Sequence, residues 1–362
     1  MHQSEKAEIK KMKSIKTKAF AVVLVILTLL SLPFTVSGEE ETKMLIPSGA
    51  VFGVKFFTKG ALVLGTTGVK TEKGVVSPAK DCGIKKGDVI IRACGKEFES
   101  ASELITLIES SGGKSVSLAV NRGGEEISLK ATPVYDRESG KYRIGIFVRD
   151  SAAGIGTVTY IVPDTGEFGG LGHGIYDSET SALLPLGSAP TVDVTVTGII
   201  KSLRDDPGEI NGNFGIKKTG ELFLNTDQGV FGKVSVLPKN LRPSLPVANK
   251  NEIRAGKAYI LSTLDGDGAK EYEIEIEKIY PSSENVKNFL IRVTDKALLE
   301  KTGGIVRGMS GSPIIQSGKL VGAVTHVLVG DPTHGYGIFI ENMLAEQKKA
   351  GNKNIRLSSL AA

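Results

Sequence analysis

The hydrophobic pattern of this chain changes at residue 38. Residues 19–38, AFAVVLVILTLLSLPFTVSG, are apolar with few interruptions, whereas the chain after them consists of short runs of β-branched and aromatic residues separated by turn residues. About 18 consecutive apolar residues are typical of a membrane-spanning helix or an export signal, and short bounded runs are typical of strands. The pattern therefore predicts one hydrophobic N-terminal helix followed by a mainly β protein.

A few segments of the β-rich part have the spacing of helices instead. Residues 100–112, SASELITLIESSG, place leucine and isoleucine on one side of a helix and end in glycine, which favours a helix with a defined stop. Segments 295–301 and 340–349 predict two more helices. A hairpin with its turn at 121–124 follows the first helix, and the many short strands after residue 135 predict a barrel or a sandwich.

The positive charge is concentrated in the first 18 residues. The net charge is +5, but residues 1–18 hold six lysines against two glutamates, which leaves 39 basic and 38 acidic residues for the rest. A nearly neutral folded part argues against nucleic acid as a partner, because duplex binding needs a basic face. Lysines before the apolar run predict a cytoplasmic N-terminus, with the remainder of the chain outside the cytoplasm. Val36 and Gly38 are small enough for a cleavage site, so an uncleaved anchor and a cleaved signal both stay open.

Residues 75–100, VVSPAKDCGIKKGDVIIRACGKEFES, carry a series of short motifs. They are Ser77-Pro78-Ala79, Cys82-Gly83-Ile84, Gly87-Asp88-Val89-Ile90 and Gly95. In this order they resemble the PDZ family, over residues 44–133. Cys82 stands where alanine is usual, and Cys94 where asparagine is usual. Export permits a disulfide between them, but two small apolar side chains are the favoured interpretation.

The PDZ resemblance implies a peptide-binding groove. Phe52-Gly53-Val54-Lys55 resembles the loop whose backbone N–H groups hold a peptide carboxylate. An extended peptide would pair with the strand that follows, as an added β-strand. The alternative is that the groove docks the neighbouring domain and binds no free peptide.

A second motif places a serine in a tight turn. In residues 302–326, TGGIVRGMSGSPIIQSGKLVGAVTH, Ser310 lies among glycines and is flanked by strand-like runs. Acyl transfer needs an activated hydroxyl and N–H donors where negative charge develops on the carbonyl oxygen. Gly308 and Ser310 are the candidates for the two N–H groups of such an oxyanion hole, and Gly311 leaves the hydroxyl uncrowded. An ordinary β-turn is the competing interpretation.

Three histidines follow the hydrophobic segment, and they differ as candidates for the base. His173, in EFGGLGHGIYD, lies in a glycine-rich loop open enough for an imidazole to be reached from two sides, although a solvated loop histidine is the alternative. Thr325 and His326 follow the serine turn on a strand that, by analogy with chymotrypsin-like proteases, lines the substrate pocket. His334 is expected in a turn. A metal site from His326, His334 and Asp331 is a further alternative, although we expect no metal.

Three longer segments resemble one family. VPDTGEFGGLGHGIYD, FLIRVTDKALLEKTGGIVRGMSGSPI and LVGAVTHVLVGDPTHGYGIFIENML, in this order after a PDZ module, resemble the sporulation stage IV B serine peptidases of endospore-forming bacteria. The resemblance spans nearly the whole chain. It implies that His173 is the general base, Ser310 the nucleophile and Asp295 the acid, in the chain order of chymotrypsin-like proteases. Met309 stands where digestive serine proteases carry an aspartate that pairs with a new N-terminus, so that activation step is not expected.

Asp295 has a competing role. A triad aspartate is buried and bonded to the imidazole N–H. Asp295, however, directly precedes a predicted helix, where an aspartate commonly caps backbone N–H groups. Asp177 and Asp193 are the alternative acids.

The predicted organisation is a basic tail (1–18), a signal anchor (19–38), a linker (39–43), a PDZ domain (44–133) and a β-barrel serine peptidase domain with a chymotrypsin-like fold (134–362). The family resemblance implies a membrane-anchored extracytoplasmic endopeptidase, in the space between mother-cell and forespore membranes and without a cofactor. It also implies self-cleavage and cleavage of a membrane protein that restrains an intramembrane protease, which activates a sporulation sigma factor. The alternative is a non-catalytic, membrane-tethered PDZ adaptor with an inactive barrel.

Overall fold

The structure is a computed structural model, and it describes residues 43–238, 241–281 and 286–349. The predicted basic tail, the predicted anchor and nearly all of the linker lie outside the described residues. Within those residues, no helix is both long and apolar enough to cross a membrane.

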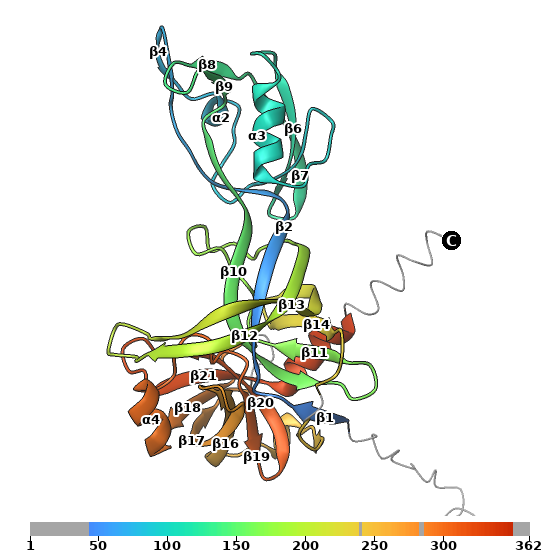
Figure 1. Ribbon diagram of the computed structural model, residues 1–362, viewed down its shortest axis with the longest axis vertical. Coiled ribbons are helices and arrows are strands. Elements are labelled where there is room, and N and C mark those ends of the chain that lie inside the picture. The colour runs from blue at the N-terminus through green and yellow to red at the C-terminus, as the bar shows by residue number, and fades with distance from the viewer. Residues whose placement is uncertain (1–42, 239–240, 282–285, 350–362) are drawn as a thin grey trace, which may run out of the picture. The chain divides into compact units, whose positions relative to one another are not determined.

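The C-terminal part of the described chain forms a closed barrel of six antiparallel strands (Figure 1). In barrel order the strands are β16 (Gly256–Thr263), β17 (Ala269–Ile279), β18 (Phe289–Val293), β21 (His334–Phe339), β20 (Lys319–Val327) and β19 (Pro313–Gln316). Side chains such as Ile260 and Ile274 point into its core, as the alternation of a half-buried strand predicts. The predicted helices are present here as α4 (Lys296–Thr302), between β18 and β19, and as a helix at 340–349 after β21.

Six further strands close another ring, which we call the first barrel because it begins earlier in the chain. In ring order they are β2 (Val51–Thr66), β10 (Ile146–Ile161), β11 (Glu167–Gly170), β14 (Gly229–Val234), β13 (Glu209–Thr226) and β12 (Leu186–Ile200), which pairs again with β2. Phe52, Phe56 and Phe168 are buried in its core. The short strands β1 (Met44–Pro47) and β15 (Leu245–Pro246) extend the sheet beyond β10. The predicted mainly β architecture is confirmed, and the barrel takes the form of two six-stranded barrels.

The PDZ module is a small sheet with one main helix. The far half of β2 pairs with β5, and β6 and β7 follow in the sheet. The helix α3 packs Leu104 and Ile108 into the core, and its first turn is capped by the hydroxyl of Ser100, which accepts from the Glu103 N–H at 3.1 Å. The elements of the module are β3 (Val69–Thr71), β4 (Gly74–Val76), α2 (Pro78–Asp81), β5 (Val89–Ala93), α3 (Ala101–Glu109), β6 (Val116–Arg122), β7 (Glu125–Ala131), β8 (Val134–Asp136) and β9 (Lys141–Arg143).

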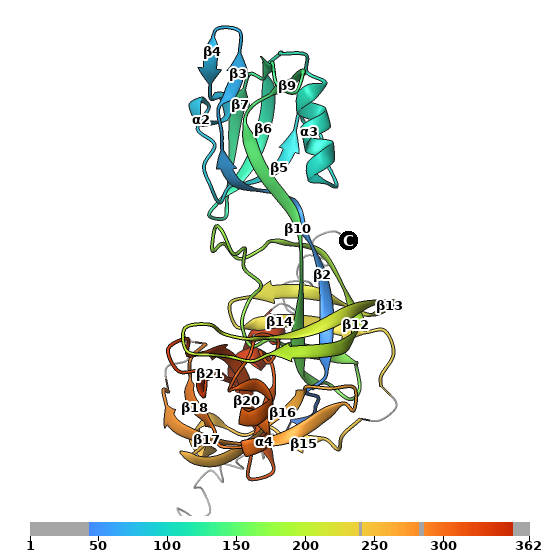
Figure 2. The same ribbon diagram turned by 60° about the vertical axis from the view of Figure 1, so that its left-hand side comes forward.

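The strands β2 and β10 belong both to the first barrel and to the PDZ module (Figures 1 and 2). Each has 16 residues, and the two pair antiparallel from Val51 with Thr157 to Thr66 with Ile146. The PDZ module is therefore inserted between two neighbouring strands of the barrel, whereas the boundary expected at 133 placed it before the peptidase domain. Gly60 lies inside β2 with a φ of +93°, and a Cβ there would lie 2.4 Å from the Ile90 carbonyl oxygen.

Candidate active site

Ser310 lies on a tight turn just before β19. Gly308 and Gly311 on either side have φ values of +97° and +96°, which residues with a Cβ rarely adopt. At Gly311 a Cβ would lie 2.0 Å from the carbonyl oxygen of Thr157. The glycines of the motif therefore allow the turn to lie directly against β10.

The first barrel holds this turn through β10. Thr157 N–H donates to the Ser310 carbonyl at 3.0 Å, and Thr157 Oγ1 donates to the Gly308 carbonyl at 2.7 Å. Thr159 Oγ1 donates in the same way to the Gly311 carbonyl, also at 2.7 Å. Both threonines are buried, so water competes little for these bonds. The position of the serine thus depends on a strand of the other barrel.

The peptide bond between Arg307 and Gly308 has an orientation that suits an oxyanion hole. The Arg307 carbonyl accepts from the Ile210 N–H of β13 at 2.9 Å, and the described residues contain no cis peptide bond. In a trans peptide the C=O and N–H groups point in opposite directions. The Gly308 N–H is therefore directed away from β13, and Gly308 lines the same cavity as Ser310. This geometry supports the expected role of Gly308 as a donor to a developing oxyanion.

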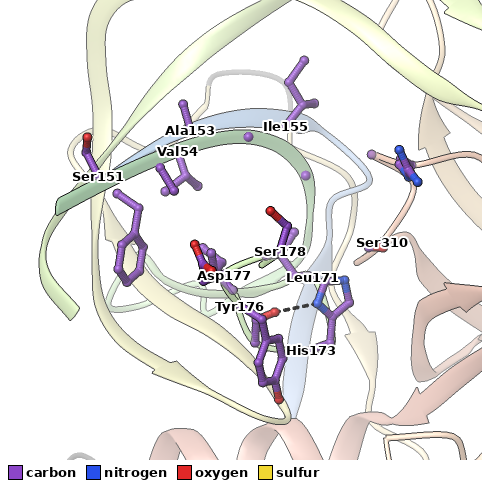
Figure 3. Close-up of a pocket in the computed structure, with 18 of the residues that line it drawn as sticks. Val54, Ser151, Ala153, Ile155, Leu171, His173, Tyr176, Asp177, Ser178 and Ser310 are labelled. Atoms are coloured by element: carbon purple, nitrogen blue, oxygen red, sulfur yellow. Dashed lines mark hydrogen bonds between the residues drawn. The ribbon is translucent and has the colours of Figure 1, made fainter. Parts of the chain in front are cut away.

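Ser310, His173 and His326 line one cavity of about 720 Å³ (Figure 3). The ring centroids of the two histidines are 4.9 Å apart. Ser310 Oγ donates to the Thr325 carbonyl at 2.8 Å, so the hydroxyl is held by a backbone oxygen in this structure. Rotation about its Cα–Cβ bond is the smallest motion that would redirect it. The predicted nucleophile and the predicted base therefore come together in one cavity, from different barrels.

The hydrogen bonding of His173 fixes its tautomer. Its Nδ1 lies 2.8 Å from the Gly174 carbonyl oxygen, the dashed line in Figure 3, and Nδ1 carries a proton because a carbonyl only accepts. Burial lowers the pKa of His173, and the Gly174 carbonyl opposes this only in part. The neutral ring with Nε2 free to accept a proton is therefore favoured, which is the state that a general base requires.

The predicted pocket residues Thr325 and His326 both adjoin the nucleophile. Thr325 does so through its carbonyl, and His326 forms part of the cavity wall. Burial, and then the nearby His173 and Lys287, lower the pKa of His326 to about 4. Its Nδ1 is buried and has no hydrogen-bond partner among the described residues. The wall beside Ser310 is therefore an uncharged imidazole at neutral pH.

The expected triad role of Asp295 is not what the structure shows. Asp295 is the N-cap of α4, and its Oδ1 accepts from the Leu298 N–H at 2.9 Å, while Oδ2 lies 3.4 Å from the Glu273 N. It does not line the cavity. The physical reason is local, since an aspartate before a helix satisfies N–H groups that have no partner inside the helix.

Neither alternative acid replaces it. Asp177 is buried in the cavity wall, but Oδ1 accepts from Thr180 and from the Glu179 N–H, and Oδ2 accepts from Arg149 at 2.6 Å. Burial acts to raise the pKa of Asp177, and these hydrogen bonds outweigh it, so the pKa lies below its ordinary value. Asp193 is exposed on β12. Among the described residues no carboxylate is hydrogen-bonded to His173, and the Gly174 carbonyl holds its Nδ1 instead.

The expected carboxylate-binding loop, Phe52 to Lys55, lies elsewhere than predicted. These residues are part of β2 inside the first barrel, where Gly53 is opposite Ile155 on one side and Val192 on the other. Phe52 and Val54 are core residues. A Cβ at Gly53 would lie 2.5 Å from the ring of Phe214, so this glycine serves packing.

A groove with the expected character is present at the other end of β10. A cavity of about 380 Å³ is lined by residues 142–147 and, from α3, by Ile105 and Ile108. Gly145 has a φ of +79° in this segment, which begins the edge strand of the PDZ sheet. The signal in the sequence was YRIGI, residues 142–146, where a glycine between isoleucines follows a hairpin.

The described residues form neither the alternative metal site nor the alternative disulfide. His334 Nδ1 lies 2.8 Å from Asp331 Oδ2, and its Nε2 lies 3.4 Å from Glu277 Oε2. No group of three or more His, Cys, Asp or Glu side chains in the described part of the chain is placed to hold a metal ion. Cys82 and Cys94 are both free thiols, so the bridge between them is not formed.

Two six-stranded barrels, with a serine turn on one and a histidine on the other facing a shared cavity, define the class of chymotrypsin-like serine peptidases. The chain belongs to the SpoIVB peptidase S55 family, whose family model matches residues 140–344. A PDZ-domain model matches residues 63–132. The predicted family is confirmed.

Curated relatives match over short stretches. A putative zinc metalloprotease of Lactococcus lactis is 34% identical over 96 residues, which cover 26% of this chain and 22% of the relative. Serine protease HTRA1 of Xenopus laevis is 37% identical over 57 residues, covering 16% and 12%. The matched stretch thus spans about a fifth or less of each of these relatives.

Solved structures show distant similarity. The HtrA-type protease AlgW with a tripeptide has 16% identity and a TM-score of 0.32, covering 54% of this chain and 55% of that chain. Rv3671c from M. tuberculosis, in an inactive form, has 14% identity and a TM-score of 0.31, covering 55% and 82%. The PDZ domain of an SdrC-like protein from Listeria monocytogenes has 26% identity and a TM-score of 0.21, covering 25% and 87%.

Proposed function

We propose that the chain is a serine endopeptidase in which Ser310 is the nucleophile and His173 the base. The observation that carries this proposal is the shared cavity, where both residues meet beside Gly308. His173 Nε2 takes the hydroxyl proton as Ser310 Oγ attacks a peptide carbonyl, and the N–H groups of Gly308 and Ser310 stabilise the oxyanion. The imidazolium then gives the proton to the leaving amine as the C–N bond breaks, and water hydrolyses the acyl-enzyme.

The bond between Ser310 and the Thr325 carbonyl adds one step to this cycle. Thr325 lies on β20 beside the cavity. A substrate backbone that offers an N–H to this carbonyl would compete with the serine hydroxyl and release it toward His173. Substrate binding and activation of the nucleophile are then the same event.

The group that orients the base is the Gly174 carbonyl. It holds the Nδ1 proton as a triad carboxylate does, and so leaves Nε2 as the acceptor. A neutral carbonyl stabilises the imidazolium less than a carboxylate does. We therefore propose a Ser–His pair with a backbone orienter.

Family membership supports a regulatory role. We propose that the N-terminal apolar segment anchors the chain in the membrane and that the peptidase acts outside the cytoplasm, between the mother-cell and forespore membranes. Its substrates are its own chain and the exposed part of a membrane protein that restrains an intramembrane protease, so that cleavage activates a sporulation sigma factor. The resemblance in sequence and the family match support this role, and the PDZ module fits the binding of protein substrates.

The rival proposal is a non-catalytic, membrane-tethered PDZ adaptor. A fluorophosphonate probe, which acylates activated serines, separates the two when it is applied to the full-length chain. We expect labelling and self-processing in the wild type and loss of both in Ser310→Ala. Ser312→Ala is the matched control, because Ser312 is buried two residues away and its hydroxyl has no partner among the described residues. Equal labelling of the wild type and Ser310→Ala would favour the adaptor.

A further inference from the structure

One edge of β10 is paired along most of its length, and the other is paired only near its end, where pairing with β11 begins at Val158. From Ile146 to Thr157 the strand pairs with β2. Within the described ranges, no strand pairs with the opposite edge between residues 146 and 156. Ser151, Ala153 and Gly154 are exposed along it.

This edge lacks the usual protection of an exposed strand. Residues 151–156 read SAAGIG, with no charge and no proline. Unpaired N–H and C=O groups on a strand edge recruit other chains, so proteins usually guard such edges with lysine, proline or a bulge. The pairing of β10 with β2 is irregular at two points, between Phe147 and Val148 and between Arg149 and Ser151, and both lie before this uncharged stretch. Residues 151–156 therefore leave backbone groups available to a partner strand.

The open edge ends at the nucleophile. Thr157 is the first residue of β10 whose backbone groups are hydrogen-bonded on that side. Its N–H donates to the Ser310 carbonyl at 3.0 Å, and its carbonyl accepts from the Leu171 N–H at 3.2 Å. Backbone groups alternate in direction along a strand, so Ile155 and Ala153 turn theirs to the same side as Thr157. Figure 3 shows Ala153 and Ile155 along one wall of the cavity that Ser310 and His173 also line.

The other end of the same strand is the PDZ groove. Ile146 and Phe147 line the 380 Å³ cavity together with the Gly145 turn and with Ile105 and Ile108 of α3. A PDZ groove binds an extended peptide as an added strand, and a backbone turn of this kind captures a C-terminal carboxylate. The two isoleucines of α3 give the cavity an apolar wall for the last side chain of such a peptide.

Strand direction relates the two ends. A chain that pairs antiparallel with β10 has its C-terminus at Ile146 and reaches Ser310 with residues nearer its N-terminus. All of the residues between belong to the leaving-group side of the scissile bond. Paired strands advance together at roughly 3.3 Å per residue, so the ten steps from Ile146 to Gly156 are matched by about ten residues of the partner.

We propose that the open edge of β10 is a binding track for the substrate, and that it sets the cut about ten residues before a free C-terminus. The substrate class is a polypeptide with an unfolded, extended C-terminal segment that ends in an apolar residue. Backbone pairing makes the middle of the track tolerant of sequence. This inference rests on the proposed peptidase activity. It adds that the enzyme recognises its substrate by the free C-terminus.

The test uses the full-length chain and a library of long peptides with apolar C-terminal residues, made by chymotryptic digestion of a cell extract. The library is cleaved in two forms, one with free C-terminal carboxylates and one that has first been methyl-esterified. The released C-terminal fragments are then sized by mass spectrometry. We expect a peak near ten residues, reduced at least fivefold by esterification. Fragments of no preferred length, or a peak that survives esterification, would contradict the proposal that β10 is a binding track.

Variants locate the effect. Ile105→Lys places a charge in the apolar wall and should abolish the length preference, whereas Ser102→Lys puts the same charge on an exposed position of α3 outside the cavity and should leave it unchanged. Ala153→Pro removes one outward N–H, and should reduce fragment yield at least tenfold with little change in Tm. If Ser310 reacts with the fluorophosphonate probe but the library yields no fragments, the track is wrong and the serine hydrolase stands. If neither reaction occurs, the proposed peptidase itself is wrong.

Discussion

The two barrels contribute differently to the site. The second barrel is continuous in sequence from Gly256 to Phe339 and supplies the serine turn. The first barrel is assembled around an inserted module and supplies His173 together with the three hydrogen bonds from Thr157 and Thr159 that hold the turn. The nucleophile therefore lies on one barrel and is positioned by the other. The geometry of catalysis depends on their interface.

The largest expected effect comes from separating the barrels at Gly311. In Gly311→Val the side chain would meet the Thr157 carbonyl, on the strand whose hydrogen bonds hold the serine turn. We expect fluorophosphonate labelling to fall roughly 100-fold or more, as for loss of an oxyanion donor, and Tm to fall as well. Gly318→Val is the control, because Gly318 has a φ of +73° but a Cβ there would have no neighbouring atom within 4 Å. It should cost only the backbone strain, about 1–2 kcal/mol; equal loss in both variants would argue against the interface.

A smaller change sharpens the comparison at Thr157. Thr157→Val keeps the side-chain shape and leaves the Gly308 carbonyl without its partner, at a cost of about 1–3 kcal/mol. Because that carbonyl is on the residue whose N–H faces the cavity, kcat for a cleaved peptide should fall about tenfold, with KM little changed. Thr159→Val loses an equivalent bond, to the Gly311 carbonyl. It should destabilise similarly and lower kcat less. If kcat falls equally in Thr157→Val and Thr159→Val, the role of Thr157 is structural only.

The third prediction concerns the pH dependence of stability, to which each barrel contributes one histidine of the site. His173 and His326 both have a pKa below the ordinary value of about 6.5, mainly because of burial. The unfolded chain therefore binds protons that the folded chain does not, and stability present above pH 6.5 should be lost as pH falls toward about 4. Denaturant unfolding at a series of pH values measures this. His326→Phe should flatten the profile, and an unchanged profile would contradict the assignment. The acid limb of kcat/KM should also lie below pH 6.5.

The smallest effect is expected at Asp295, which lies outside the interface. As an N-cap, Asp295→Ala should cost about 1 kcal/mol of stability, and Asp295→Ser should restore most of it. Both variants should keep probe labelling within a few-fold of the wild type. A loss near 10⁴-fold in Asp295→Ser would instead place this carboxylate in the triad.

The sequence predicts the local elements of this molecule well. The helix at 101–109, the hairpin of β6 and β7, and α4 follow from apolar spacing, glycine stops and turn residues, all of which act over a few residues. The serine turn is readable for the same reason, because Gly308 and Gly311 are needed where φ is positive. Histidine and serine then meet in one cavity, as the family resemblance implied.

Relationships between distant segments were harder to predict. Nothing in the composition of β2 shows that one half belongs to the first barrel and the other to the PDZ module, since both halves are equally strand-like. The sequence therefore predicts the carboxylate loop at Phe52, on the barrel half, whereas YRIGI at the start of β10 lies at the groove. Asp295 could not be assigned from sequence, because capping and catalysis use the same residue type and only the partner distinguishes them.

The insertion also governs how the first barrel is assembled. Without the module, β2 and β10 would be neighbours in a hairpin; with it, residues 67–145 form the connection between them. An unfolded connection of that length imposes an entropic penalty on closing the ring, and a folded module with adjacent ends removes most of it. Substitutions that unfold the insert are therefore expected to weaken the first barrel as well, even though the residues of the peptidase site are unchanged.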